Sequence, residues 1–230
     1  MTAIIVSLSV LTVTLAGYLY WRYVWFFRNP PRVSPPGDNF VSPADGTVVY
    51  VSSIEPQQDV IAIKKGLAAK ITDIVREDLK VPKVLIGIFM SPFSVHFNRV
   101  PLAGQVDAIR HHPANFKNHC MGSMHWRTLF KRPPFYKNSP HIVSNERTVT
   151  KFSGVFKTKL LSYYVVQIAG KSVHGIDSFF GPGDQLSKGK IFGMIRIGSQ
   201  VDLIVPVTLE MAVMVRPGDK VRAGESILIA

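Results

Sequence analysis

The chain has 230 residues, of which 47% are hydrophobic, with 27 Lys and Arg against 15 Asp and Glu, a net charge of +12 and one cysteine. This length supports one sizeable core with at most a small annex, and the single cysteine, Cys120, excludes an internal disulfide and a cysteine-based metal cluster. The excess of positive charge predicts an anionic partner, either nucleic acid or an anionic membrane surface, or else a solvated basic face.

The N-terminal segment predicts a membrane anchor over residues 1–27. Residues 1–21 carry no charged side chain and are long enough to span a bilayer. Aromatic residues and three arginines follow: Trp21, Tyr23, Trp25, Phe26 and Phe27, with Arg22, Arg28 and Arg32. Because no Lys or Arg precedes the span, the positive-inside rule places the N-terminus outside the cell membrane and the remaining chain on the cytoplasmic side. A cleaved signal peptide is the alternative, but the segment has no basic start and no clear cleavage site.

A proline-rich stretch over residues 28–39 predicts a stiff, extended linker, and a folded domain follows over residues 40–230. Short apolar runs between Gly and Pro residues predict strands at 47–52, 83–90, 105–109, 148–152, 163–169, 191–197, 201–205 and 226–229. One helix is expected over residues 67–79, from the helical spacing of Leu67, Ile71, Ile74, Val75 and Leu79. The class is mainly β with a few short helices.

Two weak internal repeats favour a small β-sandwich of two similar halves. Pro182-Gly-Asp, with Gly189 after it, recurs as Pro217-Gly-Asp with Gly224 after it. The pattern Pro43-x-x-Gly46-x-Val48 also resembles Pro101-x-x-Gly104-x-Val106. Similar short strands and turns build the biotinyl- and lipoyl-carrier domains, although turn chemistry alone also produces such repeats.

A glycine–serine pair, Gly198-Ser199, interrupts the strand pattern of residues 192–206. Ser199 shares its parity with the apolar residues of the run, so its hydroxyl points toward the core, where an unpaired hydroxyl is costly. Gly198 allows backbone dihedrals that strain other residues. A serine hydroxyl against the preceding carbonyl has the geometry for an N→O acyl shift, which cuts the chain. The alternative is a glycine bulge followed by an ordinary serine.

Two other residues have side chains that can activate such a hydroxyl as a nucleophile. Asp45 lies at a turn that opens a strand, and His96 emerges between Val95 and Phe97. With Ser199 they would form a base-activated nucleophile. The alternatives are an ordinary Asp-Gly turn and a histidine buried for structural reasons.

Residues 110–147 combine seven Lys or Arg with one acid, Glu146. The segment also holds aromatic residues and five histidines: Phe116, Trp126, Phe130, Phe135, Tyr136, His111, His112, His119, His125 and His141. Such a segment fits a lipid headgroup layer, single-stranded nucleic acid, or a mobile exposed loop. A zinc site is disfavoured, because the carboxylate ligands and an H-E-x-x-H motif are missing.

Five stretches together resemble the short form of the phosphatidylserine decarboxylase family. They are Ser-Pro-Ala-Asp-Gly-Thr-Val (42–48), Met-Ser-Pro-x-x-Val-His-x-Asn-Arg-x-Pro (90–101), Asn-Glu-Arg (145–147), Val-Gln-Ile-Ala-Gly (166–170) and Phe-Gly-Met-Ile-Arg-Ile-Gly-Ser-Gln-Val-Asp-Leu (192–203). They follow the family's order, and some members also carry an N-terminal membrane segment.

The resemblance implies an enzyme that makes its own cofactor. Ser199 attacks the Gly198 carbonyl, and the chain splits into residues 1–198 and 199–230, which stay associated. Ser199 becomes a pyruvoyl group, which forms a Schiff base with phosphatidylserine and accepts electrons as CO2 leaves, giving phosphatidylethanolamine. The substrate partner is an anionic phospholipid in the membrane, with no metal and no nucleic acid. The lipid backbone, ester or ether, and a homo-oligomer are left open.

The same resemblance assigns roles to residues. Asp45 matches the aspartate that assists self-cleavage, and His96 matches a histidine near the pyruvoyl group in decarboxylation and reprotonation. Substrate binding is assigned to Asn98, Arg99 and Arg147.

The chain departs from the family pattern in three places. Asn98 and Arg99 follow His96 where many members carry a second histidine. His96 then serves both steps, or another histidine such as His174 takes part, or Asp45 acts alone. The 109–141 segment has no family role, and residues 172–175 replace a more basic run.

Two other classes compete with the enzyme. A membrane-tethered carrier-like or adaptor β-module without catalysis predicts a modifiable lysine at a hairpin tip or a coiled-coil hairpin, and the sequence shows neither. A basic nucleic-acid-binding domain needs a stacking or groove-reading motif, and none is apparent.

Overall fold

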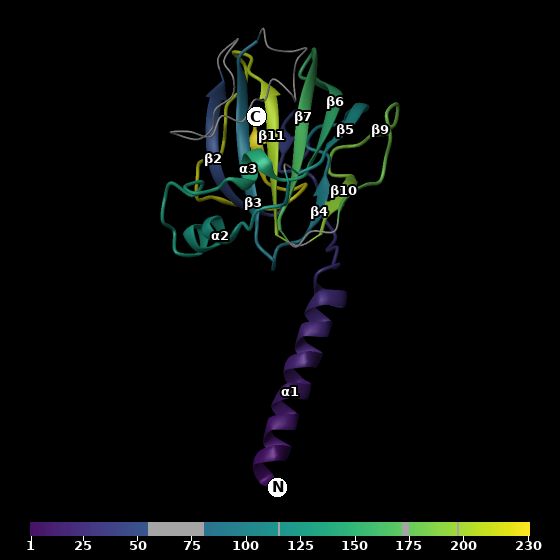
Figure 1. Cartoon of the computed structure of the whole chain (residues 1–230). Helices are drawn as coiled ribbons and strands as arrows, with labels where there is room; N and C mark the ends of the chain where they lie inside the picture. The colour runs from purple at the N-terminus through teal and green to yellow at the C-terminus, as the bar shows by residue number, and fades with distance from the viewer. Residues whose placement is uncertain (55–80, 115, 172–174, 197) are drawn as a thin grey trace.

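A long apolar helix stands apart from a β domain in the computed structural model (Figure 1), which describes residues 1–54, 81–114, 116–171, 175–196 and 198–230. The helix α1 (Thr2–Tyr20) continues as a π-helical turn, η1 (Trp21–Trp25), and none of their residues is buried. Together they are long and apolar enough to cross a membrane. The expected N-terminal apolar helix is therefore confirmed.

The domain is built on one curled antiparallel sheet with the strand order β12-β2-β3-β11-β7-β6-β5-β9. Its strands are β2 (Gly46–Ile54), β3 (Lys83–Met90), β5 (Gly104–His112), β6 (Arg147–Phe156), β7 (Lys159–Ala169), β9 (Gln185–Leu186), β11 (Ser199–Pro206) and β12 (Lys220–Val221). Two smaller sheets accompany it: β4 (Phe97–Arg99) with β10 (Ile191–Ile195) and β8 (Ile176–Ser178), and β1 (Phe40–Val41) with β13 (Ile227–Ile229). The mainly β class is confirmed.

The repeats noted in the sequence correspond to matching corners of the sheet. In one half the N–H of Gly218 donates to the carbonyl of Val48 at 2.8 Å, and in the other the N–H of Gly183 donates to Val106 at 2.8 Å. Each Pro-Gly-Asp turn thereby leads a short edge strand, β12 or β9, onto β2 or β5. The two halves of the strand order mirror each other about the β11–β7 pair, which confirms the prediction of two similar halves.

Alternation along the strands creates two cores, one on each face of the sheet. On β11, Val201 and Leu203 face an inner core closed by the two small sheets, and Ile204 faces an outer core. Ser199 has the parity of the inner residues, as expected, and is fully buried.

Part of the segment over residues 116–145 covers the outer core, so of the alternatives for this segment a fully exposed loop is wrong. The segment contains α2 (Gly122–Leu129) and α3 (His141–Ser144), seen against the sheet in Figure 1. Its apolar side chains Met121, Met124, Phe135 and Ile142 are buried against the strands. The helix expected over residues 67–79 lies outside the described residues.

Candidate active site

Ser199 begins β11 at one end of the large sheet. It pairs with Met90 at the end of β3 and with Ala169 at the end of β7. The Ser199 side chain is fully buried, and its Oγ donates to the Met90 Sδ at 3.4 Å. Because a thioether is a weak acceptor, this buried hydroxyl has no strong partner among the residues that the structure describes.

Gly198, directly before it, has a φ of +62°, in the left-handed region. A Cβ built on Gly198 would meet nothing within 4 Å, so this position requires glycine for its backbone conformation rather than for space. The unusual backbone expected at this glycine is confirmed.

His96 lies on the loop that leads from β3 into β4, and its side chain is fully buried. Its Nδ1 is 2.9 Å from the carbonyl oxygen of Ser94. A carbonyl only accepts, so Nδ1 carries the proton and Nε2 presents a lone pair. This Nε2 is buried and has no hydrogen-bond partner among the described residues.

The environment of His96 keeps its ring neutral. Burial lowers the pKa of His96 to about 4, with the charge of Arg28 acting in the same direction and the Ser94 hydrogen bond opposing them. The ring of Phe26 lies against the imidazole, with centroids 4.3 Å apart. Both neighbours come from residues 21–28, which we call the juxtamembrane segment, so this segment forms one wall of the histidine site.

Buried polar side chains connect β4 with Ser199. Asn98 of β4 is buried two residues after His96, and its Nδ2 is 3.8 Å from the Met90 sulfur that Ser199 also contacts. The Asn98 Oδ1 accepts a hydrogen bond from Gln167 Nε2 at 2.8 Å. Sequence reasoning assigned no role to Met90 or Gln167. The available signal was a polar Gln167 at an inward position of an apolar strand.

Asp45 connects the linker of residues 28–39 to the segment that follows β12. Its Oδ2 accepts from Arg32 at 2.9 Å, and its Oδ1 accepts from the N–H of Ala223 at 2.7 Å. Arg32 also pairs with Glu225 at 2.7 Å. In the uncut chain Asp45 and the His96 Nδ1 therefore have separate hydrogen-bond partners.

Arg99 and Arg147 donate hydrogen bonds to groups other than Ser199. Arg99 donates to Asn29 at 2.7 Å and to the carbonyl of Gly189 at 2.9 Å, which secures the linker. Arg147 belongs to the outer face of the sheet. Their assignment to substrate binding stays a prediction, and His174 lies outside the described residues.

A second buried polar cluster lies on the outer face beneath α3. Gln200 donates to Asp202 at 2.7 Å, Tyr50 donates to the other oxygen of Asp202 at 2.8 Å, and His141 Nε2 is 3.2 Å from Gln200 Oε1. Burial raises the pKa of Asp202 to about 6. This cluster fixes the residues that follow Ser199. Within the described ranges, no three His, Cys, Asp or Glu side chains gather as they would around a metal ion.

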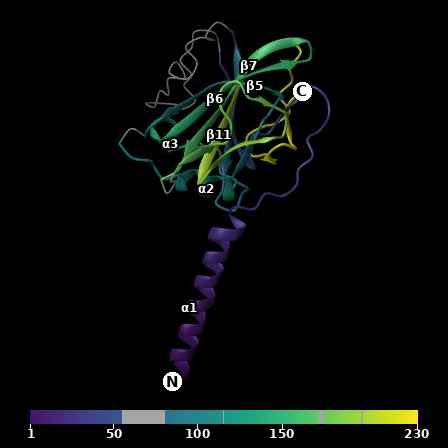
Figure 2. The same cartoon turned by 90° about the vertical axis from the view of Figure 1, so that its right-hand side faces the viewer.

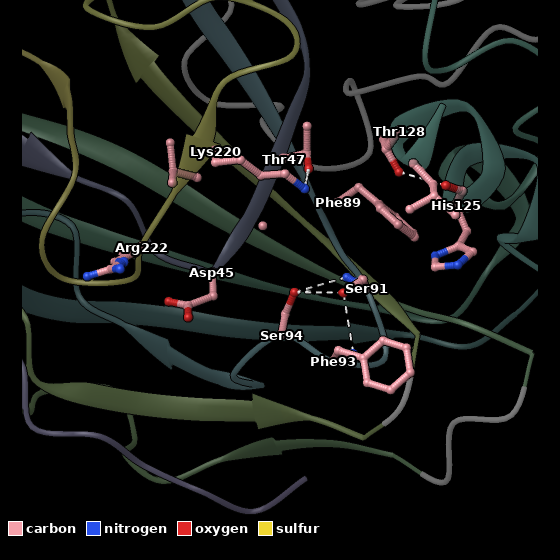
Figure 3. A pocket seen from close by; sticks show the side chains of 13 residues that line it. Asp45, Thr47, Phe89, Ser91, Phe93, Ser94, His125, Thr128, Lys220 and Arg222 are labelled. Carbon is pink, nitrogen blue, oxygen red and sulfur yellow. Dashed lines mark hydrogen bonds between the residues drawn. The ribbon is translucent and has the colours of Figure 1, made fainter. Parts of the chain in front are cut away.

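A pocket of about 390 Å³ opens beside the loop that carries His96 (Figure 3). Asp45 and Arg222 lie on one side and His125 of α2 on the other, with Ser91 and Ser94 between them. Lys220, Phe93 and Leu129 also line it. Cationic and apolar side chains thus meet at its rim, a combination that suits an anionic amphiphile.

Comparison with known proteins gives a consistent result. The family model for phosphatidylserine decarboxylase matches residues 19–229. A putative archaetidylserine decarboxylase proenzyme of Methanopyrus kandleri is 35% identical over 96% of this chain and 86% of its own length. Phosphatidylserine decarboxylase proenzymes of Saccharopolyspora erythraea and Thermobifida fusca are 32% and 33% identical over 93% and 96% of this chain, and over 75% and 77% of their own lengths.

Proposed function

This chain belongs to the phosphatidylserine decarboxylase family, and from that premise we propose that it is a proenzyme that cuts itself between Gly198 and Ser199 and then decarboxylates phosphatidylserine to phosphatidylethanolamine. The observation that carries the proposal is the buried Ser199 hydroxyl, weakly bonded and next to a left-handed glycine. Relatives named for phosphatidyl and for archaetidyl lipids share the serine headgroup, so the headgroup defines the substrate class.

Self-cleavage follows from the chain's own groups. The Ser199 Oγ attacks the Gly198 carbonyl carbon while the lone pair on His96 Nε2 takes the hydroxyl proton, and the peptide nitrogen leaves as an amine, which gives an ester. Loss of the Ser199 Cα proton then expels the Gly198 carboxylate. Water converts the resulting dehydroalanine into the pyruvoyl group and ammonia. The resemblance supports a role for Asp45 in self-cleavage, and its hydrogen bonds to Arg32 and to the N–H of Ala223 hold the linker and the segment after β12 at this end of the sheet.

Three groups of the chain act in the proposed mature site: the pyruvoyl group, Asn98 and His96. The pyruvoyl group supplies a carbonyl that captures the substrate amine and accepts electrons as CO2 leaves. Asn98, beside Met90 and Ser199, is the best-placed of the expected substrate-binding residues. His96 returns a proton to the substrate carbon after taking one up at Nε2, because its Nδ1 proton is bonded to Ser94.

The membrane arrangement follows from the N-terminal helix. Residues 1–27 anchor the protein, residues 28–39 link the anchor to the catalytic domain of residues 40–230, and that domain faces the cytoplasm at the cell membrane. Chains 1–198 and 199–230 stay associated, since β11 pairs with β3 and β7 and β13 pairs with β1. The substrate never leaves the bilayer, so an anchored basic domain suits it.

An intact-mass spectrum of the protein purified from membranes tests the proposal. We expect two chains that break after residue 198, the smaller one without a free amino terminus, and release of labelled CO2 from phosphatidylserine labelled at the serine carboxyl. A carrier-like or adaptor module would give one uncut chain and no CO2, and that result would overturn the proposal.

Replacing Phe26 by alanine is expected to change the pH dependence of self-cleavage. Loss of the ring exposes His96, so its pKa rises from about 4 toward the ordinary 6.5. Cleavage needs the neutral imidazole, so at about pH 5.5 the rate of the variant falls to about a tenth of its own plateau, whereas the parent stays near its plateau. The measurement is the cleavage rate of proenzyme made by cell-free synthesis in lipid nanodiscs and shifted across pH.

Two controls accompany this variant. Tyr23→Ala removes an exposed ring of the same segment and keeps the parent profile. Phe26→Leu retains apolar cover and restores most of the low pKa. A parent-like profile for Phe26→Ala would show that Phe26 does not keep His96 neutral.

A further inference from the structure

The helix α2 has an exposed apolar face that the fold of the domain does not use. Met124 and Thr128 point into the outer core. On the other side Trp126, Leu129 and Phe130 are 57%, 58% and 58% exposed. The rings of Trp126 and Phe130 stack at 5.6 Å with an interplanar angle of 11°, so they present one flat apolar surface.

Cationic side chains border this surface. Arg127 of α2 is half-buried and donates to the carbonyls of Arg132 and Pro134, and Lys131 and Arg132 follow the helix, both exposed. The Arg132 guanidinium lies 5.8 Å from the centre of the Phe130 ring. Aromatic and aliphatic residues framed by Lys and Arg are typical of a helix that lies in the interface of an anionic bilayer. We use the name α2 patch for the three apolar and three cationic residues together: Trp126, Leu129, Phe130, Arg127, Lys131 and Arg132.

The α2 patch lies at the same end of the domain as the N-terminal helix. In both Figures 1 and 2, α2 sits at the end from which α1 leaves. Phe93, on the loop beside α2, is exposed and lies against Trp21 of the juxtamembrane segment, with ring centroids 6.3 Å apart. Leu129 of the patch and Phe93 line the same pocket (Figure 3), so the pocket shares this end.

We propose that the α2 patch is a second membrane contact, which lies on the anionic leaflet that α1 enters and holds the pocket beside α2 at the headgroup layer. The proposal rests on the anchoring proposed above. The occupant is an anionic phospholipid surface, because the patch is framed by cations and lies beside the anchor. The N-terminal helix attaches the domain to the bilayer at one point, whereas two contacts fix which side of the domain faces the lipid.

The depth of a spin label on α2 tests this proposal in the full chain. In a Cys120→Ser background, a label at Leu129→Cys is compared with one at Leu160→Cys, in nanodiscs that contain phosphatidylglycerol. Leu160 is 75% exposed and lies on β7 at the end of the strand opposite Ala169, the partner of Ser199. We expect the label at 129 to be more accessible to oxygen than to a water-soluble nickel complex, and the label at 160 to show the reverse. Equal, water-like accessibility at both positions would overturn the proposal.

Charge reversal provides a second, independent readout. Changing Lys131 and Arg132, the two exposed cations of the patch, together to glutamate is expected to return the label at 129 to water, and neutral phosphatidylcholine nanodiscs should act in the same direction. Protection of the label by oligothymidine, but not by anionic nanodiscs, would overturn the proposal in favour of nucleic-acid binding. Because label depth requires no cleavage, an uncut and inactive chain would refute the proposed function and leave this test intact.

Discussion

Ser199→Ala is expected to leave a single uncut chain with no decarboxylase activity. The variant lacks the oxygen that attacks Gly198, and no pyruvoyl group forms without that attack. The fold should persist, because the Ser199 Oγ contributes one weak hydrogen bond to Met90 and the alanine methyl fits an inward position of β11. The intact mass and CO2 release of the membrane-bound protein measure both effects.

Two further variants make this test specific. Ser123→Ala removes an exposed hydroxyl of α2 that bonds to the Lys137 carbonyl, and it should process like the parent. Ser199→Cys retains a nucleophile and should cleave, more slowly than serine. Processing that persists in Ser199→Ala would remove Ser199 from its proposed role.

His96→Ala is expected to slow self-cleavage by about 10²- to 10⁴-fold, the range that a positioned general base contributes. In the proposed mechanism the neutral imidazole, whose Nδ1 proton is bonded to the Ser94 carbonyl, accepts the Ser199 proton at Nε2, which has no partner among the described residues. Precursor should accumulate, and total CO2 release should fall with the fraction of cut chain. A pulse-chase experiment on proenzyme in nanodiscs gives the rate.

The His96→Ala experiment needs one control for the loss of an imidazole elsewhere and one for the stability of the fold. His111→Ala removes a half-exposed imidazole 3.7 Å from Glu146 and should leave the rate unchanged. Thermal unfolding of His96→Ala in the uncut Ser199→Ala background separates loss of the base from loss of packing against Phe26. Cleavage of His96→Ala at the parent rate, with an unchanged fold, would show that another group is the base.

Local patterns in the sequence were enough to predict the sheet. Alternation along residues 192–206 predicted a strand at 201–205 and the inward direction of Ser199, because the side-chain period of a strand depends on local geometry alone. The Pro-Gly-Asp turns predicted two similar halves for the same reason: each turn sets its own backbone and the edge strand that follows. The left-handed Gly198 was similarly readable from residue type.

Local sequence patterns could not predict the contacts between segments that are distant in the sequence. The packing of the segment with α2 could not be predicted, because its buried side chains, such as Met124 and Phe135, are spread among Lys, Arg and Pro without a clear period. The contact of Phe26 with His96 joins an anchor to a loop, and no local signal encodes it. The separate partners of Asp45 and His96 depend on where Arg32 and Ser94 lie in space, which spacing in the sequence does not determine.

The central position of β11 would set how long the proposed mature enzyme lasts. In that two-chain form the fragment of residues 199–230 contributes β11 as an interior strand, paired with β3 on one edge and with β7 on the other. If heating releases this fragment, refolding requires two separate polypeptides to associate, because the peptide bond between them no longer exists. Durability is therefore governed by the rate at which the sheet opens, and protein refolded from denaturant should recover activity only from precursor that was never cut.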